Sequence, residues 1–167
     1  QLAQVKDTLV RVSEERVQYA LLAGSIDKNV VQIQQFLQDV AATRGLDGLD
    51  DGFENAQENF DALNQSLAKF EKYFVGVGDT ASVATVKKIQ RDAELYFARG
   101  QTLAKAYVAG GPEAGNKLMA DFDLVSELLQ KALQPFVQAQ VDAMKGDLAD
   151  AAVRSDRISQ TGVIIVG

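Results

Sequence analysis

The spacing of its apolar residues limits the fold of this chain more than any other feature. Apolar residues recur at alternating steps of three and four over long stretches. That spacing places them on one face of an α-helix, along the seam where the helices of a bundle pack. The longest stripe comprises Val5, Leu9, Val12, Tyr19, Ala23, Ile26, Val30, Ile33, Leu37 and Val40.

Three more stripes follow, and glycine-rich breaks separate them at residues 45–52, 76–78 and 110–112. The three stripes comprise Phe53, Ala56, Phe60, Leu63, Leu67, Phe70 and Phe74; then Val83, Val86, Ile89, Ala93, Phe97, Gly100, Leu103 and Tyr107; and then Leu118, Phe122, Val125, Leu129, Ala132 and Phe136. Glycine and aspartate favour turns, so we predict helices at about 2–44, 52–75, 79–109 and 112–160. Short connections make neighbouring helices antiparallel. The predicted fold is therefore all-α: an up-down-up-down four-helix bundle without strands, in one domain. The first and fourth helices are the longest and form a stalk at one end.

Local signals refine these boundaries. Asp50 or Asp51 is expected to cap the second helix, and Asp79 or Thr80 the third. Pro135 is expected to kink the fourth helix, because proline removes a backbone hydrogen bond.

The last ten residues, 158–167, form an apolar run after Arg157. The run is shorter than the roughly 20 apolar residues that span a bilayer. It is typical of the first turns of a transmembrane helix, and the chain also begins inside a helical pattern. We expect an extracytoplasmic domain with membrane spans on both flanks. A buried C-terminal tail is the alternative.

Composition excludes several functions. The chain has no His and no Cys, so a disulfide, an ordinary zinc site, a Cys nucleophile and a c-type haem are excluded. A ferritin-like di-iron site is excluded as well, because it needs Glu-x-x-His motifs and the chain has no His. The net charge of −6 disfavours nucleic acid as a partner. No catalytic arrangement is visible, and we expect no enzyme activity, no cofactor and no metal.

Two blocks resemble a known family. Residues 30–53 read VVQIQQFLQDVAATRGLDGLDDGF, and residues 106–123 read AYVAGGPEAGNKLMADFD. Both resemble segments of the periplasmic sensor regions of bacterial methyl-accepting chemotaxis proteins and related transmembrane signalling proteins. Phe36 stands where that pattern has Trp, and Gln38 where it has Thr. The resemblance implies a periplasmic sensor domain between two membrane spans, but it names no ligand.

The candidate site lies at the end away from the predicted stalk. Topology brings together the loop after the first helix and the loop after the third, and the two blocks straddle these loops. Arg44 falls on the seam and can bind a carboxylate through its planar fork. Gln35 and Asn116 are expected to donate or accept hydrogen bonds, and Tyr107 to form an apolar wall. The alternative is that these residues lock the loops, with Arg44 paired to Asp47, Asp50 or Asp51.

Other polar positions have simpler explanations. Arg16 also falls on the seam, and an ion pair with an acidic residue of the fourth helix is favoured over ligand binding. The aspartates at 47, 50 and 51 lack calcium-loop spacing, so turn and cap roles are favoured. The amides at 32, 34, 35 and 38 are expected to line a polar pocket or to face a second copy of the first helix.

We therefore expect a ligand-binding chemoreceptor sensor domain that binds a small solute, with organic anions among the candidates. A secondary apolar stripe on the first helix, at Val10, Val17, Leu21 and Val31, favours a homodimer through that helix. The alternative is a structural helical bundle that reads a partner protein.

Overall fold

The computed structural model describes residues 2–44, 46 and 51–163, with side chains at 10, 12–44, 46 and 51–157. Three helices make up this part of the chain: α1 (Leu2–Thr43), α2 (Gly52–Gly76) and α3 (Thr80–Val163). The described residues contain no strand. The all-α prediction is therefore confirmed, and α1 continues through Gly24 as its unbroken register predicted.

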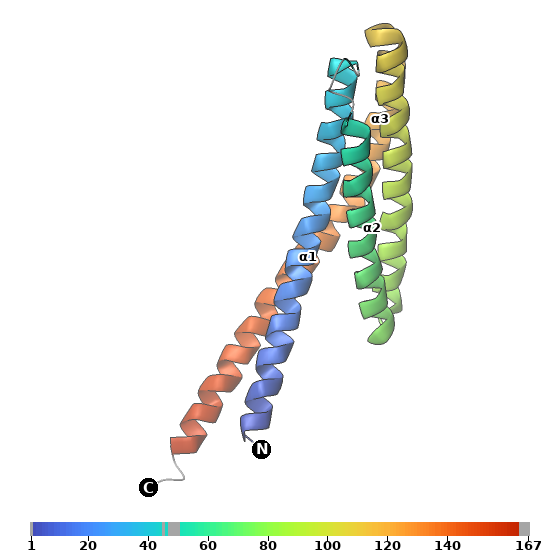
Figure 1. Cartoon of the computed structure of the whole chain (residues 1–167). Coiled ribbons are helices and arrows are strands. Elements are labelled where there is room, and N and C mark those ends of the chain that lie inside the picture. Colours follow the sequence, from blue (N-terminus) through green and yellow to red (C-terminus); the bar gives the residue numbers. More distant parts are fainter. Residues whose placement is uncertain (1, 45, 47–50, 164–167) are drawn as a thin grey trace.

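The predicted third and fourth helices both fall within α3, an element of 84 residues, and the predicted break between them lies at Gly111. Gly111 alone within α3 has non-helical dihedral angles, with φ 63° and ψ −160°. The chain reverses at this residue, so α3 has a first arm (80–110) and a second arm (112–163) that lie side by side (Figure 1). A positive φ suits glycine, and Pro112 suits the first turn of the arm that follows. The helix continues through Pro135.

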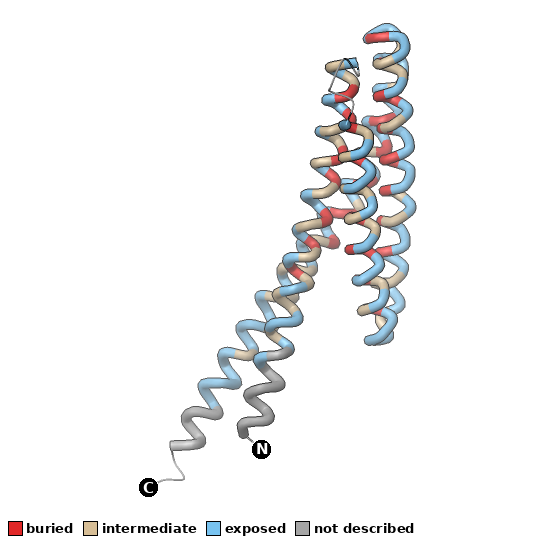
Figure 2. The backbone as a smooth tube through the Cα atoms, viewed as in Figure 1, coloured by how far each residue is buried: buried red, intermediate tan, exposed pale blue. Residues whose placement is uncertain are grey.

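The predicted seams form a hydrophobic core where α2 packs with α1 and α3. In α1 the seam from Ala23 to Val40 is buried, with exposed fractions between 0% and 6%. Figure 2 shows these buried positions gathered along the inner faces of the helices. The seams of α2 and of both arms of α3 are also buried, except for half-buried Phe53, Phe60, Val83, Tyr107, Leu118 and Ala132.

Tyr96 links three helical segments inside this core, although it lies off the predicted seam. Its side chain is fully buried, and its hydroxyl donates to the Val30 carbonyl oxygen at 3.4 Å. Its ring stacks on Phe122 of the second arm, with centroids 5.2 Å apart. Burial raises the pKa of Tyr96 far above its ordinary value, because the phenolate would be poorly solvated.

Away from this core, α1 and the second arm of α3 continue together as a two-helix stalk (residues 2–18 and 137–163), as Figure 1 shows. No described side chain of the stalk is buried. Val12 follows the predicted seam, yet it lies in the stalk and is 46% exposed. Val5 and Leu9 lie outside the described side chains.

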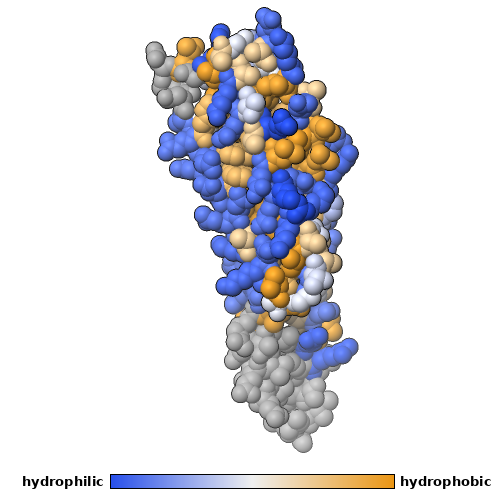
Figure 3. Space-filling model, turned by 90° about the vertical axis from the view of Figure 1, so that its right-hand side faces the viewer, coloured by the Kyte–Doolittle hydropathy of each residue, from blue (hydrophilic) through white to orange (hydrophobic). Residues whose placement is uncertain are grey.

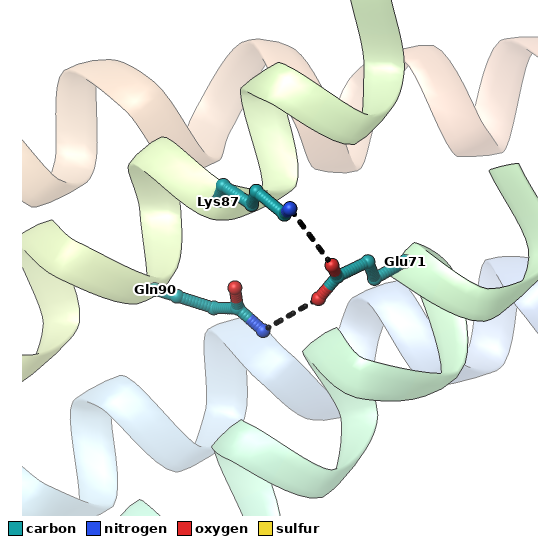
Figure 4. Close-up of polar contacts among 3 residues, drawn as sticks. All are labelled: Glu71, Lys87 and Gln90. Atoms are coloured by element: carbon teal, nitrogen blue, oxygen red, sulfur yellow. Dashed lines mark hydrogen bonds and ion pairs between the residues drawn. The ribbon is translucent and has the colours of Figure 1, made fainter. Parts of the chain in front are cut away.

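The turn between α2 and α3 is held by polar contacts. Asp79 caps α3, as predicted: its Oδ1 accepts from the Ser82 backbone N–H at 3.0 Å. Lys87 Nζ lies 3.4 Å from Glu71 Oε1, and Gln90 Nε2 donates a hydrogen bond to Glu71 Oε2 at 3.5 Å (Figure 4). At the start of α2, Asp51 occupies the cap position but makes no side-chain capping bond, and Asp50 lies outside the described residues.

No helix among the described residues is long and apolar enough to cross a bilayer. Helix α3 extends to Val163, so it includes the first part of the apolar run at 158–167. The rest of that run lies outside the described residues, and the expected membrane spans remain a prediction.

Candidate distal cleft

A cleft of about 390 Å³ opens between α1 and the two arms of α3, in the half of the molecule away from the stalk. We call it the distal cleft and define it by its lining. The polar part of the lining comprises Gln34, Gln38, Arg44, Tyr107 and Asp123. The apolar part is led by Leu37, Leu103, Met119 and Phe122. Its volume falls within the range of about 300–1,000 Å³ that is usual for small-molecule sites.

The face of α1 that lines the cleft follows from helical periodicity. Gln34, Leu37, Gln38 and Ala41 recur at steps of three and four, so they share one face. Leu37 is 4% exposed, whereas Gln38 is exposed, so the cleft runs from the core to the surface. A ligand could therefore place an apolar part inward and a polar part outward.

The floor of the cleft depends on Gly100 of the first arm. A Cβ atom there would lie 2.6 Å from Leu37 Cδ1 and 3.1 Å from Phe122 Cε2. The missing side chain lets α1 and both arms of α3 approach closely at this level. Sequence reasoning had placed Gly100 on the seam, but the cleft behind it had no sequence signal.

Arg44 stands at the mouth of the cleft, just beyond the end of α1. It was predicted to be the last helical residue, but its φ of 56° puts it outside the helix in the left-handed region. Its guanidinium faces the reversal at Gly111, where a built Cβ atom would lie 3.8 Å from Arg44 Cζ. The side chain is exposed, and no ion pair joins it to Asp51 or to any other described side chain.

Tyr107 lines the cleft, and Asn116 supports it from outside. The Tyr107 hydroxyl donates to Asn116 Oδ1 at 2.5 Å, which joins the two arms of α3 across the reversal. Gly115 lets the ring pack there, because a Cβ at that position would overlap the ring of Tyr107. Asn116 itself does not line the cleft, so its expected direct contact with a ligand becomes a bracing role toward Tyr107.

Gln35 is the predicted site residue that the structure moves away from the cleft. Its side chain is exposed and accepts a hydrogen bond from Gln32 at 3.2 Å. One residue along a helix turns the side chain by about 100°, so Gln34 and Gln38 line the cleft instead. Two of the four amides that were expected to line a polar pocket or to face a second copy of α1 therefore line the distal cleft.

Asp123 and the apolar wall formed by Met119 and Phe122 were not proposed as site residues. Phe122 was assigned to the core seam, where it also lies, at 5% exposed. Asp123 closes the second recognised block, and its place one residue after a seam position was the available signal. Helical periodicity alone could not show that the two arms of α3 leave space between them.

The other candidates have structural roles. Arg16 Nε lies 2.6 Å from Asp147 Oδ2 on the second arm of α3, which confirms the predicted ion pair. Asp47 and Asp50 lie outside the described residues. Among the residues that the structure describes, no group of three or more His, Cys, Asp or Glu side chains could hold a metal ion.

Comparisons of the chain with known protein families, with curated proteins and with solved structures found no match. The resemblance of residues 30–53 and 106–123 to chemoreceptor sensor regions therefore remains an expectation from the sequence. Both blocks contribute to the distal cleft: the first supplies Gln34 to Arg44, and the second supplies Tyr107 to Asp123.

Proposed function

We propose that this chain is the periplasmic ligand-binding sensor domain of a transmembrane chemoreceptor or related signalling protein. Its four helical segments, α1, α2 and the two arms of α3, then form an up-down-up-down four-helix bundle. A small solute binds in the distal cleft, and membrane spans flank the domain at the stalk. The domain has no enzyme activity of its own and needs no cofactor.

One observation carries this proposal: the two sequence blocks that resemble sensor regions meet at one cleft. The cleft is lined by a cation, amides and a phenol above an apolar floor. A concave, mostly apolar site with a few convergent polar groups is the usual form of a small-molecule site. The lining comes from α1 and from both arms of α3, and of these α1 and the second arm continue into the stalk.

A signal would pass along the stalk. A solute that binds one relative position of α1 and the second arm more tightly shifts the population toward that position. Small helix displacements of about 1–2 Å are a known form of such switching. The Arg16–Asp147 ion pair joins these two segments at the bundle end of the stalk and is positioned to report their displacement.

The domain works as a homodimer through α1. Val10 is 50% exposed, Leu21 65% and Val31 56%, so the secondary stripe of α1 leaves an apolar flank without cover. In a second copy the same stripe would meet it across a two-fold axis. Sedimentation of a longer, membrane-tethered form tests this, and a pure monomer would contradict it.

A thermal-shift screen of organic acids, amino acids and inorganic ions tests the central function. A solute that binds the native state raises the melting temperature. Ala42 is exposed and lines the cleft, so Ala42→Trp fills the cleft with little risk to folding. Ala139, an exposed residue of the stalk, supplies the matched control Ala139→Trp. The proposal expects a shift that Ala42→Trp abolishes and Ala139→Trp keeps.

The second candidate function is that of a helical bundle that binds a partner protein rather than a small molecule. Leu95, Leu124 and Leu128 on α3 favour it, because they are 43%, 57% and 43% exposed. On the face seen in Figure 3, hydrophobic side chains gather mainly in the half away from the stalk. This candidate predicts that no small solute in the screen shifts the melting temperature, and that Ala42→Trp changes no interaction.

A further inference from the structure

The two ends of the distal cleft carry opposite charges. Arg44 lies at the end beside Gly111, where α3 reverses. Asp123 follows Gly111 by twelve positions along the second arm, which at about 1.5 Å per residue separates the two levels by roughly 18 Å. On α1, Gln34 precedes Arg44 by ten positions, about 15 Å, so it lies toward the Asp123 end. The cleft is therefore elongated and electrically polar.

Neither charge is neutralised by the protein within the described residues. The ion pairs there join other side chains, and none includes Arg44 or Asp123. Both side chains are exposed at the rim, so each can meet a ligand without a large desolvation cost. Arg44 presents a planar fork that matches a carboxylate. Asp123 presents a negative charge that repels one.

The middle of the cleft is apolar. Leu37 and Phe122 form its inner wall, and both are nearly buried. Leu103 and Met119 continue that wall, and methionine adapts its shape to an aliphatic chain. A ligand that fills this middle excludes water from apolar surface, which favours binding.

We propose that the distal cleft selects amphipathic monocarboxylates, with the carboxylate at Arg44 and the apolar body along Leu37 and Phe122. Asp123 excludes a second carboxylate at the far end, so a dicarboxylate of the same length is rejected. This inference rests on the proposed small-solute function and adds the class of ligand. Arg44 provides affinity, and Asp123 provides specificity.

Octanoate and octanedioate are the matched probes, because they share eight carbons and differ by one terminal carboxylate. Calorimetric titration of the full 167-residue chain is expected to show octanoate binding at least about fivefold more tightly, which is the effect of one like charge about 4 Å away in water. Asp123→Asn keeps the size of the side chain and should bring the two affinities within about twofold. Arg44→Gln should weaken octanoate binding about tenfold or more.

Three results would overturn the ligand class. Equal binding of the two probes by the unaltered chain would mean that Asp123 does not discriminate between one and two carboxylates. Hydrogen bonds donated by the Gln34 and Gln38 amides to the second carboxylate would be one reason. Octanoate binding that survives Ala42→Trp would place that ligand elsewhere. If neither octanoate nor octanedioate binds, the monocarboxylate class is also rejected. Circular dichroism of each variant establishes that the variant is folded.

The solute screen separates this failure from failure of the proposed function. If octanoate does not bind but another solute does, and Ala42→Trp abolishes that binding, the sensor function stands and the monocarboxylate class falls. If no solute in the screen binds, both fall together.

Discussion

The two halves of α1 carry the same apolar seam but bury it differently. Between Ala23 and Val40 the seam packs against α2 and both arms of α3, and its side chains are buried. Val12 lies on the same seam in the stalk, where α1 continues beside the second arm of α3 (Figure 1), and it is 46% exposed. A heptad pattern therefore specifies a face of a helix, whereas the number of neighbouring helices decides whether that face becomes a core.

The bundle half and the stalk also differ in how tightly they are packed, which bears on stability and on signalling. The bundle half has an aromatic cluster in which Phe70 contacts Tyr19, Phe74 and Phe136. The stalk has no buried side chain among those described, and an ion pair holds its bundle end. A weakly packed pair of helices can shift at small energetic cost, which suits the transmission that we propose.

The largest expected difference is between two truncations on the seam of α1. Ile33 is fully buried, so Ile33→Ala should lower the free energy of unfolding by about 2–5 kcal/mol, through lost burial and a cavity. Val12→Ala in the stalk should change it by no more than about 0.5 kcal/mol. Urea unfolding measures both. Equal losses would mean that the stalk is packed as tightly as the bundle.

A smaller effect is expected at the reversal of α3. Gly115→Ala places a methyl group in the ring of Tyr107 and should cost about 1–3 kcal/mol, because the ring or the helix must shift. The same change at Gly146 in the stalk meets no atom within 4 Å. Gly146→Ala should instead be neutral or slightly stabilising, since alanine favours helix. Thermal unfolding of the two variants tests the contrast, and a destabilised Gly146→Ala would contradict it.

The ion pair at the end of the stalk should contribute less. Arg16 and Asp147 are 30% and 36% exposed, and Arg16 also lies over the Tyr73 ring at 5.4 Å. A double-mutant cycle with Arg16→Ala and Asp147→Ala should give a coupling of at most about 1 kcal/mol, lower at high salt. A larger coupling that salt does not change would show a buried and rigid junction.

The smallest effect concerns pH at the cap of α3. Hydrogen bonds from the Ser82 hydroxyl and backbone N–H lower the pKa of Asp79. Because the folded pKa lies below the unfolded one, the contribution of Asp79 is complete above the unfolded pKa and is lost as pH falls through the folded pKa. The melting temperatures of the native chain and Asp79→Ala should therefore differ at pH 7 and converge as the pH falls below the folded pKa of Asp79. A difference that persists in acid would assign the effect to helix propensity.

Much of the fold could be predicted because the local spacing of apolar residues determines the helices and their buried faces. The boundaries of α1 and α2, the buried seam and the Arg16 ion pair follow from spacing and charge. The break at 110–112 was also predicted, but not that Gly111 alone makes the reversal, because a positive φ at one glycine can reverse a chain without a longer loop. The sequence predicted that Arg44 and Tyr107 lie close together, and both line the distal cleft. It chose Gln35 over Gln34 because periodicity did not specify the phase of a polar face.

Amide hydrogen exchange tests the central claim most directly, because it compares the two regions within one molecule. The full chain is measured with and without the solute that gives the largest thermal shift. The account predicts added protection in residues 34–44 and 100–123, which line the distal cleft, and a smaller change in the stalk. Protection confined to the exposed flank of α1, or spread evenly along the chain, would contradict a binding site in the distal cleft.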